Sequence, residues 1–137
     1  MVMCQMCFRA TLFLTFLFQF AWVAPAIDSL PEQKALRFFK QAEALYNLEE
    51  PTPYSDSLAI NNYLSAAQLF PDTGIFSEKK FGCYLNAGII EQSNLKQAAA
   101  LANYNQSCNT VKRAGLPDSL LFKPYLFSGN AHYFLNH

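Results

Sequence analysis

The sequence has few of the residues from which catalytic and metal sites are usually built. Its 137 residues include two histidines and four cysteines; Cys83 and Cys108, the cysteines beyond the apolar N-terminal segment, lie 25 residues apart, which is not the spacing of a metal-binding pair. Its five glycines are dispersed, so it has no glycine-rich loop of the kind that holds phosphates. Ten basic residues balance ten acidic ones without forming a basic stripe, which argues against a nucleic-acid partner. We therefore expect a protein without catalysis, cofactor or metal.

The sequence also lacks an apolar run long enough to cross a membrane. Residues 11–23 are apolar except for one glutamine and two threonines, but a helix needs about 20 residues to cross roughly 30 Å of hydrocarbon. This run follows a basic start and precedes Ala-Pro-Ala at 24–26, which is the order of features in a secretory signal peptide. We predict that residues 1–26 are a signal peptide cleaved after Ala26. Residues 27–137 would then form one secreted or periplasmic domain without a membrane span.

No stretch alternates between apolar and polar residues for long enough to predict a β-strand. Apolar residues recur instead at helical spacing in five segments, which predicts an all-α fold. The predicted helices begin near Ser29, Ser55, Glu78, Asn94 and Ser119.

Local signals mark the ends of these helices. Gly74 and Gly115 are expected in the left-handed conformation that often terminates a helix. Pro124 leaves two alternatives open: either the last helix begins there, or it begins earlier and kinks. The predicted N-cap residues are Ser29, Ser77, Asn94 and Asp118.

Many residues recur 41 positions further along the chain. The pairs are Ala59/Ala100, Asn62/Asn103, Tyr63/Tyr104, Gly74/Gly115, Phe81/Phe122, Tyr84/Tyr125, Leu85/Leu126 and Gly88/Gly129. Small and aromatic residues at a fixed period are typical of stacked helical units. Because a glycine inside a helix costs about 1 kcal/mol relative to alanine, we expect Gly88 and Gly129 to mark close contacts between helices.

Within this period, Tyr84-x₂-Ala87-Gly88 and Ala100-x₃-Tyr104 follow the pattern of the tetratricopeptide repeat (TPR). The chain resembles that family over about residues 35–137, although its period is longer than the roughly 34 residues of the family. The resemblance implies an α-solenoid of helix-turn-helix repeats with a period of about 41 residues, truncated in the third repeat. It also implies a protein or peptide ligand on the concave face.

A second resemblance concerns the stretch from Ser119 to Tyr133. Together with Asp56-Ser-Leu-Ala upstream, it looks like the secreted N-terminal repeat regions of bacterial CHAT-domain proteins. That resemblance implies an alternative function, as the regulatory repeat region of a larger caspase-like peptidase whose catalytic domain is not in this chain. Capture of a carbohydrate or lipid is a third alternative.

The TPR pattern also suggests where a partner binds, because the first helix of each unit faces inward. The residues predicted near that inner stripe, and so to bind a partner, are Asn86, Lys123, Asn130 and Tyr133. The last helix carries more apolar surface than one neighbouring helix covers. We therefore expect that further repeats follow it, or that self-association or a partner covers it.

Cys83 and Cys108 are the cysteines that remain after the predicted cleavage. If a turn near Asn94 joins two antiparallel helices, these two residues lie level along the helix axes. The sequence leaves open whether they form a disulfide in an oxidising compartment or are buried as small core residues.

Overall fold

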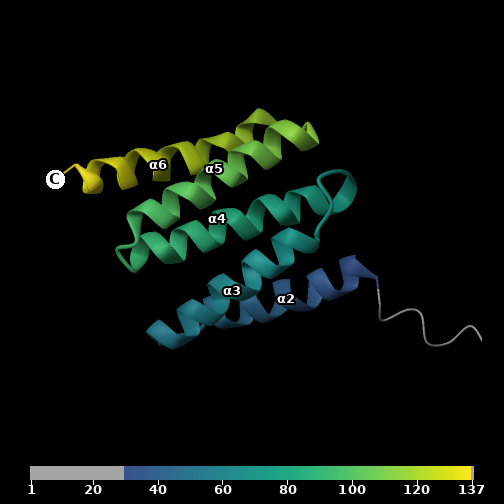
Figure 1. Ribbon diagram of the computed structural model, residues 1–137, viewed down its shortest axis with the longest axis horizontal. Helices are drawn as coiled ribbons and strands as arrows, with labels where there is room; N and C mark the ends of the chain where they lie inside the picture. The colour runs from purple at the N-terminus through teal and green to yellow at the C-terminus, as the bar shows by residue number, and fades with distance from the viewer. Residues whose placement is uncertain (1–29, 137) are drawn as a thin grey trace, which may run out of the picture. The chain divides into compact units, whose positions relative to one another are not determined.

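The computed structural model describes residues 30–136, and this part of the chain is helical without strands (Figure 1). The all-α prediction is therefore confirmed. The α-helices are α2 (Pro31–Tyr46), α3 (Pro53–Leu69), α4 (Ser77–Ser93), α5 (Gln97–Ala114) and α6 (Phe122–Leu135). Two short 3₁₀ helices, η2 (Gly74–Phe76) and η3 (Asp118–Leu121), precede α4 and α6. The predicted signal peptide and the predicted cap at Ser29 lie outside the described residues.

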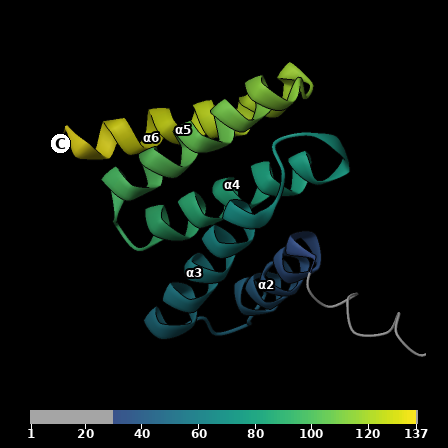
Figure 2. The same ribbon diagram turned by 45° about the vertical axis from the view of Figure 1, so that its right-hand side comes forward.

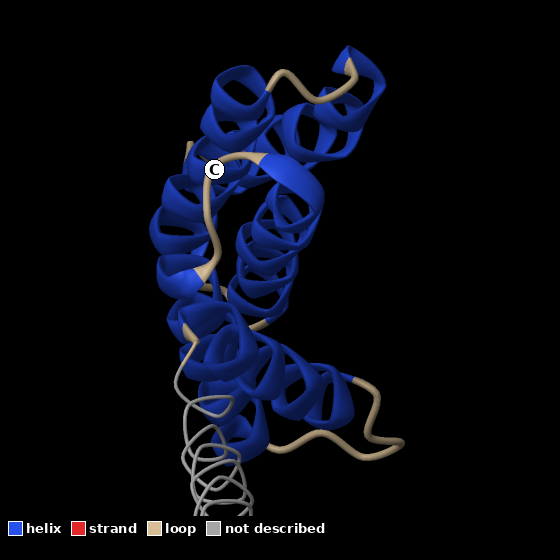
Figure 3. Cartoon of the chain, turned by 90° about the vertical axis from the view of Figure 1, so that its right-hand side faces the viewer, coloured by secondary structure: helices blue, strands red, loops and turns tan. Residues whose placement is uncertain are grey.

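Each helix packs chiefly against the helix that follows it in the chain. Thus α2 packs on α3, α3 on α4, α4 on α5 and α5 on α6, and Figures 1 and 2 show the same order from two directions. Figure 3 shows that short loops and turns connect the helices. Among residues 30–136, no helix is both long and apolar enough to cross a membrane.

Helix α3 begins two residues earlier than the sequence pattern predicts. Thr52 is its N-cap: the Thr52 hydroxyl accepts a hydrogen bond from the Ser55 backbone N–H at 3.1 Å. The Ser55 hydroxyl in turn accepts one from the Thr52 backbone N–H at 2.8 Å. Pro53 fits the first helical position, where its missing N–H leaves no bond unmade. Pro53 is therefore the first residue of α3 and not part of the connection before it.

The turn between α4 and α5 also differs from the prediction. Asn94 does not cap α5, because α5 begins at Gln97 and Lys96 occupies the cap position. Leu95 has a φ of 60°, in the left-handed region, which moves the start of the helix beyond the reach of the Asn94 side chain. Asn94 instead donates a hydrogen bond to the Asp56 carboxylate at 3.0 Å, so it fastens this turn to α3.

Ser77 and Asp118 are not N-caps either. Ser77 is the first residue of α4, and its hydroxyl donates to the Gly74 carbonyl at 2.7 Å. Asp118 opens η3, which replaces a first α-helical turn. This 3₁₀ turn leaves Pro124 inside the first turn of α6, where proline is tolerated, so the first of the two alternatives for Pro124 is confirmed.

The two connection glycines adopt the predicted conformation. Gly74 has a φ of 77° and Gly115 a φ of 64°, both in the left-handed region that favours glycine. Gly115 is the C-cap of α5, whereas Gly74 opens η2 and lies beyond the C-cap of α3 at Phe70.

Helix α4 contributes to both hydrophobic clusters of the described chain. Cys83, Ala87 and Ile90 pack with residues of α2 and α3 around the fully buried Tyr63. Phe81 and Leu85, on another side of α4, pack with Ala100, Tyr104 and Val111 of α5. The helix is therefore covered from two directions.

Gly88 marks a close contact between α4 and α5, as predicted. A Cβ atom at this position would lie 2.6 Å from a ring carbon of Tyr104 and 3.2 Å from the Ala100 carbonyl oxygen. The same prediction is wrong for Gly129. No described atom lies within 4 Å of the place where its Cβ would be, because that side of α6 is exposed.

Candidate functional site

A groove lies where α2, η2 and the first half of α4 meet. We call it the α2–α4 groove; it is a shallow, largely open depression of about 390 Å³. Its lining residues are Phe39 of α2, Ile75 of η2, and Glu78, Lys79, Gly82 and Asn86 of α4. The four residues of α4 share one helix face, since they lie one, four and eight positions after the first.

The apolar side of the groove is formed by an aromatic ring that its neighbours hold in place. Phe39 packs edge-on against Tyr63 and Phe70, with ring centroids 6.2 and 6.3 Å apart. The Lys79 ammonium lies 5.0 Å from the Phe39 ring centroid, within the range of a cation–π interaction. Ile75, on η2, is 84 % exposed and so presents an aliphatic side chain to solvent.

Asn86 supplies the groove with an oriented amide. Its side-chain NH₂ donates to the Tyr63 hydroxyl at 3.3 Å. Burial raises the pKa of Tyr63 to about 12, and the bond from Asn86 only partly offsets this, so the hydroxyl stays neutral at physiological pH. No other described group bonds the amide oxygen of Asn86 or its second N–H. An amide fixed in this way can bond the backbone of an extended peptide.

Gly82 leaves the middle of the groove open. It lies inside α4 with no described atom within 4 Å of the place where its Cβ would be, and its φ is not positive. Neither close packing nor backbone conformation therefore explains this glycine. A side chain of any size at this position would project into the groove, because its neighbours one turn away, Glu78 and Asn86, line it.

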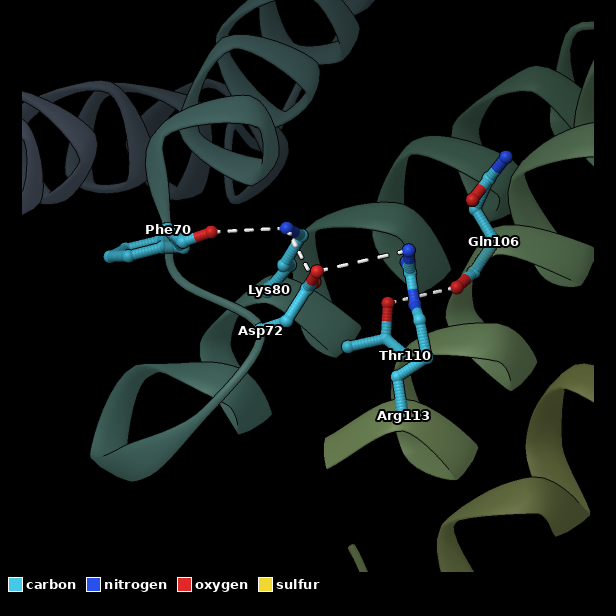
Figure 4. A network of polar contacts seen from close by, with 6 residues as sticks. All are labelled: Phe70, Asp72, Lys80, Gln106, Thr110 and Arg113. Atoms are coloured by element: carbon cyan, nitrogen blue, oxygen red, sulfur yellow. Dashed lines mark hydrogen bonds and ion pairs between the residues drawn. The ribbon is translucent and has the colours of Figure 1, made fainter. Parts of the chain in front are cut away.

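A network of polar contacts holds the connection that carries Ile75 (Figure 4). The buried Lys80 ammonium donates to the Phe70 carbonyl at 3.1 Å and pairs with the Asp72 carboxylate at 2.7 Å. Arg113 of α5 approaches the same carboxylate at 3.8 Å. The hydrogen bond from Lys80 lowers the pKa of Asp72 below 3.8, and the charges of Lys80 and Arg113 lower it further. The loop between α3 and η2 is thereby tied to both α4 and α5.

The structure does not bring the four predicted partner-binding residues together. Asn86 lies on α4 beside Tyr63 of α3, in the α2–α4 groove. Lys123, Asn130 and Tyr133 share α6, and all three are exposed there. The sequence pattern missed Phe39, Ile75 and Gly82, although a helix-interior glycine with no packing role was a usable signal for Gly82.

The two cysteines are free and buried. Cys83 points into the cluster formed with α2 and α3, away from α5, so lying level with Cys108 does not bring the two thiols together. Of the two alternatives for these cysteines, the structure has both as buried free thiols. Burial raises the pKa of Cys83 to about 12 and also raises the pKa of Cys108, which disfavours the reactive thiolate of either residue.

Within residues 30–136, no cluster of three or more His, Cys, Asp or Glu side chains is arranged to hold a metal ion. No family model, curated protein or solved structure matches this chain.

Proposed function

We propose that this chain is an exported helical-repeat module that binds a protein or peptide segment in the α2–α4 groove, without catalysis of its own. The observation that carries the proposal is Gly82. This glycine lies inside α4, its lack of a side chain leaves the groove open, and no packing contact explains its presence. The groove is lined mainly by α4, which would be the first helix of the second repeat. That position agrees with a ligand on the concave face of a TPR-like solenoid.

Two features of the packing support a repeat with a period of about 41 residues. Tyr63 and Tyr104, which lie 41 positions apart, are both fully buried. Their hydrogen-bond partners do not follow the period: Asn86 donates to the Tyr63 hydroxyl at 3.3 Å, whereas the Tyr104 hydroxyl donates to Gln92 of the same helix α4 at 2.6 Å. Ala59 and Ala100 are likewise buried at matching positions, where small residues let helices approach.

The lining of the groove favours a peptide over a small polar ligand. Phe39 and Ile75 offer apolar contact, Asn86 offers an amide, and Glu78 and Lys79 place charges of both signs at the rim. Interfaces with peptides combine these elements: apolar pockets accept side chains, and fixed polar groups bond the backbone. Because the rim charges cancel, we expect a segment with an aliphatic or aromatic residue and little net charge.

The test is selection of random twelve-residue peptides on the full chain, followed by fluorescence anisotropy with the selected peptides. The Gly82→Leu variant fills the groove and replaces a helix-weakening residue, so it should fold at least as stably as the wild type. We expect it to bind the peptides at least about tenfold more weakly, the loss expected when about 1.4 kcal/mol of contact is removed.

Ala102→Leu is the matched control, because Ala102 is exposed on α5 and does not line the groove. It adds similar bulk to a helix surface and should bind the peptides as the wild type does. Failure to select any peptide, or equal binding by the Gly82→Leu variant, would overturn the proposal.

A further inference from the structure

The outward face of α6 carries a row of large apolar side chains. Phe122 is 69 % exposed, Tyr125 54 %, Leu126 48 % and Tyr133 60 %. At 100° per residue, all four lie within about 60° of the direction in which Gly129 points. Pro124 and Ala131, on the opposite side, are buried towards the rest of the chain. We call these four residues together with Gly129 the α6 face.

The α6 face has little charge to attract or repel a partner. Helix α6 has no acidic residue, and its basic groups are Lys123 and His132. Exposed apolar patches of this kind usually mark an interaction site, because leaving them in water is unfavourable. The partner must therefore present an apolar surface of similar length.

We propose that the partner is a second copy of this chain, with two α6 helices packed antiparallel across a two-fold axis at Gly129. In a two-fold interface the same patch must fit itself, so residues equally far from the axis face each other. Tyr125 of one copy then lies against Tyr133 of the other, and Leu126 against His132. Phe122 lies against Asn136, so no like charges meet.

Gly129 makes such a crossing sterically possible. The chain already uses a glycine in this way at Gly88, where the Ala100 carbonyl of α5 comes within 3.2 Å of the Cβ position. At Gly129 no described atom occupies the corresponding space. Because the aromatic residues of the α6 face lie on both sides of this notch, two copies can interdigitate around it.

The area available is sufficient for a specific dimer. A fully covered aromatic side chain buries about 150–250 Å², so each partly exposed ring of the α6 face offers about 100–150 Å². With Leu126 added, the apolar contribution is about 400–500 Å² per copy. If two thirds of the interface is apolar, two copies bury about 1,200–1,500 Å², in the lower part of the range for specific complexes.

Sedimentation velocity of the full chain tests this proposal over about 1–200 µM, where an interface of this size is expected to associate. We expect a concentration-dependent monomer–dimer equilibrium in the wild type. Gly129→Glu places two carboxylates on the axis and should abolish the dimer while circular dichroism shows unchanged helix content. Ala102→Glu, an exposed substitution on α5, should leave it intact. A wild type that stays monomeric, or a dimer that survives Gly129→Glu, overturns the proposal.

Cross-linking locates the axis independently. In a background with Cys4→Ser and Cys7→Ser, a Gly129→Cys variant should form a covalent dimer on mild oxidation, because residues on a two-fold axis meet their own copies. Ala102→Cys should remain uncrosslinked under the same conditions. Equal cross-linking at both positions would show random collision and contradict the antiparallel α6 arrangement.

Discussion

Helices α4 and α6 carry the same residue at four pairs of positions 41 residues apart. These residues are mostly buried in α4 and exposed in α6. Phe81 of α4 is 6 % exposed and its counterpart Phe122 is 69 % exposed. Leu85 is 6 % exposed, whereas Leu126 is 48 % exposed. Helix α4 has α3 on one side and α5 on the other, whereas the described residues cover α6 mainly through α5. The same apolar side chain is therefore buried or exposed according to how many helices pack around the helix that carries it.

The largest expected difference between the two helices is the response to truncating the matched phenylalanines. Phe81→Ala should cost about 3–5 kcal/mol of unfolding free energy, because it leaves a cavity between α4 and α5. Phe122→Ala should cost less than about 0.5 kcal/mol, as for other exposed positions. Thermal unfolding monitored by circular dichroism at low micromolar concentration measures both. Similar losses in the two variants would mean that α6 is covered as α4 is.

Substituting alanine for each of the matched glycines gives a second test, because the unfolding free energy should change in opposite directions at the two positions. Gly88→Ala should destabilise the fold by about 1–3 kcal/mol, since the new methyl group overlaps the Tyr104 ring. Gly129→Ala should stabilise it by about 0.5–1 kcal/mol, because alanine favours the helix and finds open space. Urea unfolding of the two variants gives both values. Stabilisation by Gly88→Ala would contradict the close contact between α4 and α5.

The connection before α4 contains an ion pair that the connection before α6 lacks, since Leu121 stands at the position matching Lys80. Lys80→Met should therefore destabilise by about 1–3 kcal/mol, because it leaves the Phe70 carbonyl and the Asp72 carboxylate without their donor. Lys79→Met removes an exposed ammonium that lies over the Phe39 ring, so it should cost no more than about 0.5–1 kcal/mol. It should still weaken peptide binding in the α2–α4 groove, because Lys79 lines it.

The smallest expected effect concerns pH. The pKa of Asp72 is lowered in the folded state, so its contribution to stability is present above pH 3.8 and is lost as the pH falls through the folded-state pKa. The carboxylate is partly exposed, so screening limits this contribution to less than about 1 kcal/mol. The melting temperature of the wild type should exceed that of Asp72→Asn at pH 6, and the difference should shrink below pH 3.8. A difference in melting temperature that grows as the pH falls would contradict a lowered pKa of Asp72 in the folded state.

The helices and their glycine ends could be predicted from the sequence because both depend on local physics. Apolar spacing identifies α2 to α6, and the positive φ of Gly115 follows from its place at a helix end. Thr52 is harder to identify as a cap, because prolines on both sides of it are as typical of a connection as of a helix start. Asn94 was misassigned because the left-handed Leu95 shifts the start of α5, and a leucine gives no sign of that conformation.

The α2–α4 groove was not predictable in the same way, because it depends on which helix faces cross. Asn86 was identified from the family pattern, but its partner Tyr63 lies 23 positions away and on another helix. Phe39 joins the groove only because α2 folds back beside α4. The cysteines show the same limit: helix length places Cys83 and Cys108 at one level, whereas helix rotation decides that Cys83 faces α2 and α3.

The position of α4 in both hydrophobic clusters has a consequence for how the fold opens. Helix α2 or α6, each of which packs chiefly on one neighbouring helix in the described part of the chain, can detach while the cluster on the other side of α4 stays intact. Helix α4 itself cannot leave without breaking both clusters at once. The amide hydrogens of Leu85 and Ala87 should therefore exchange with solvent only through global unfolding, whereas those of α6 exchange through local opening.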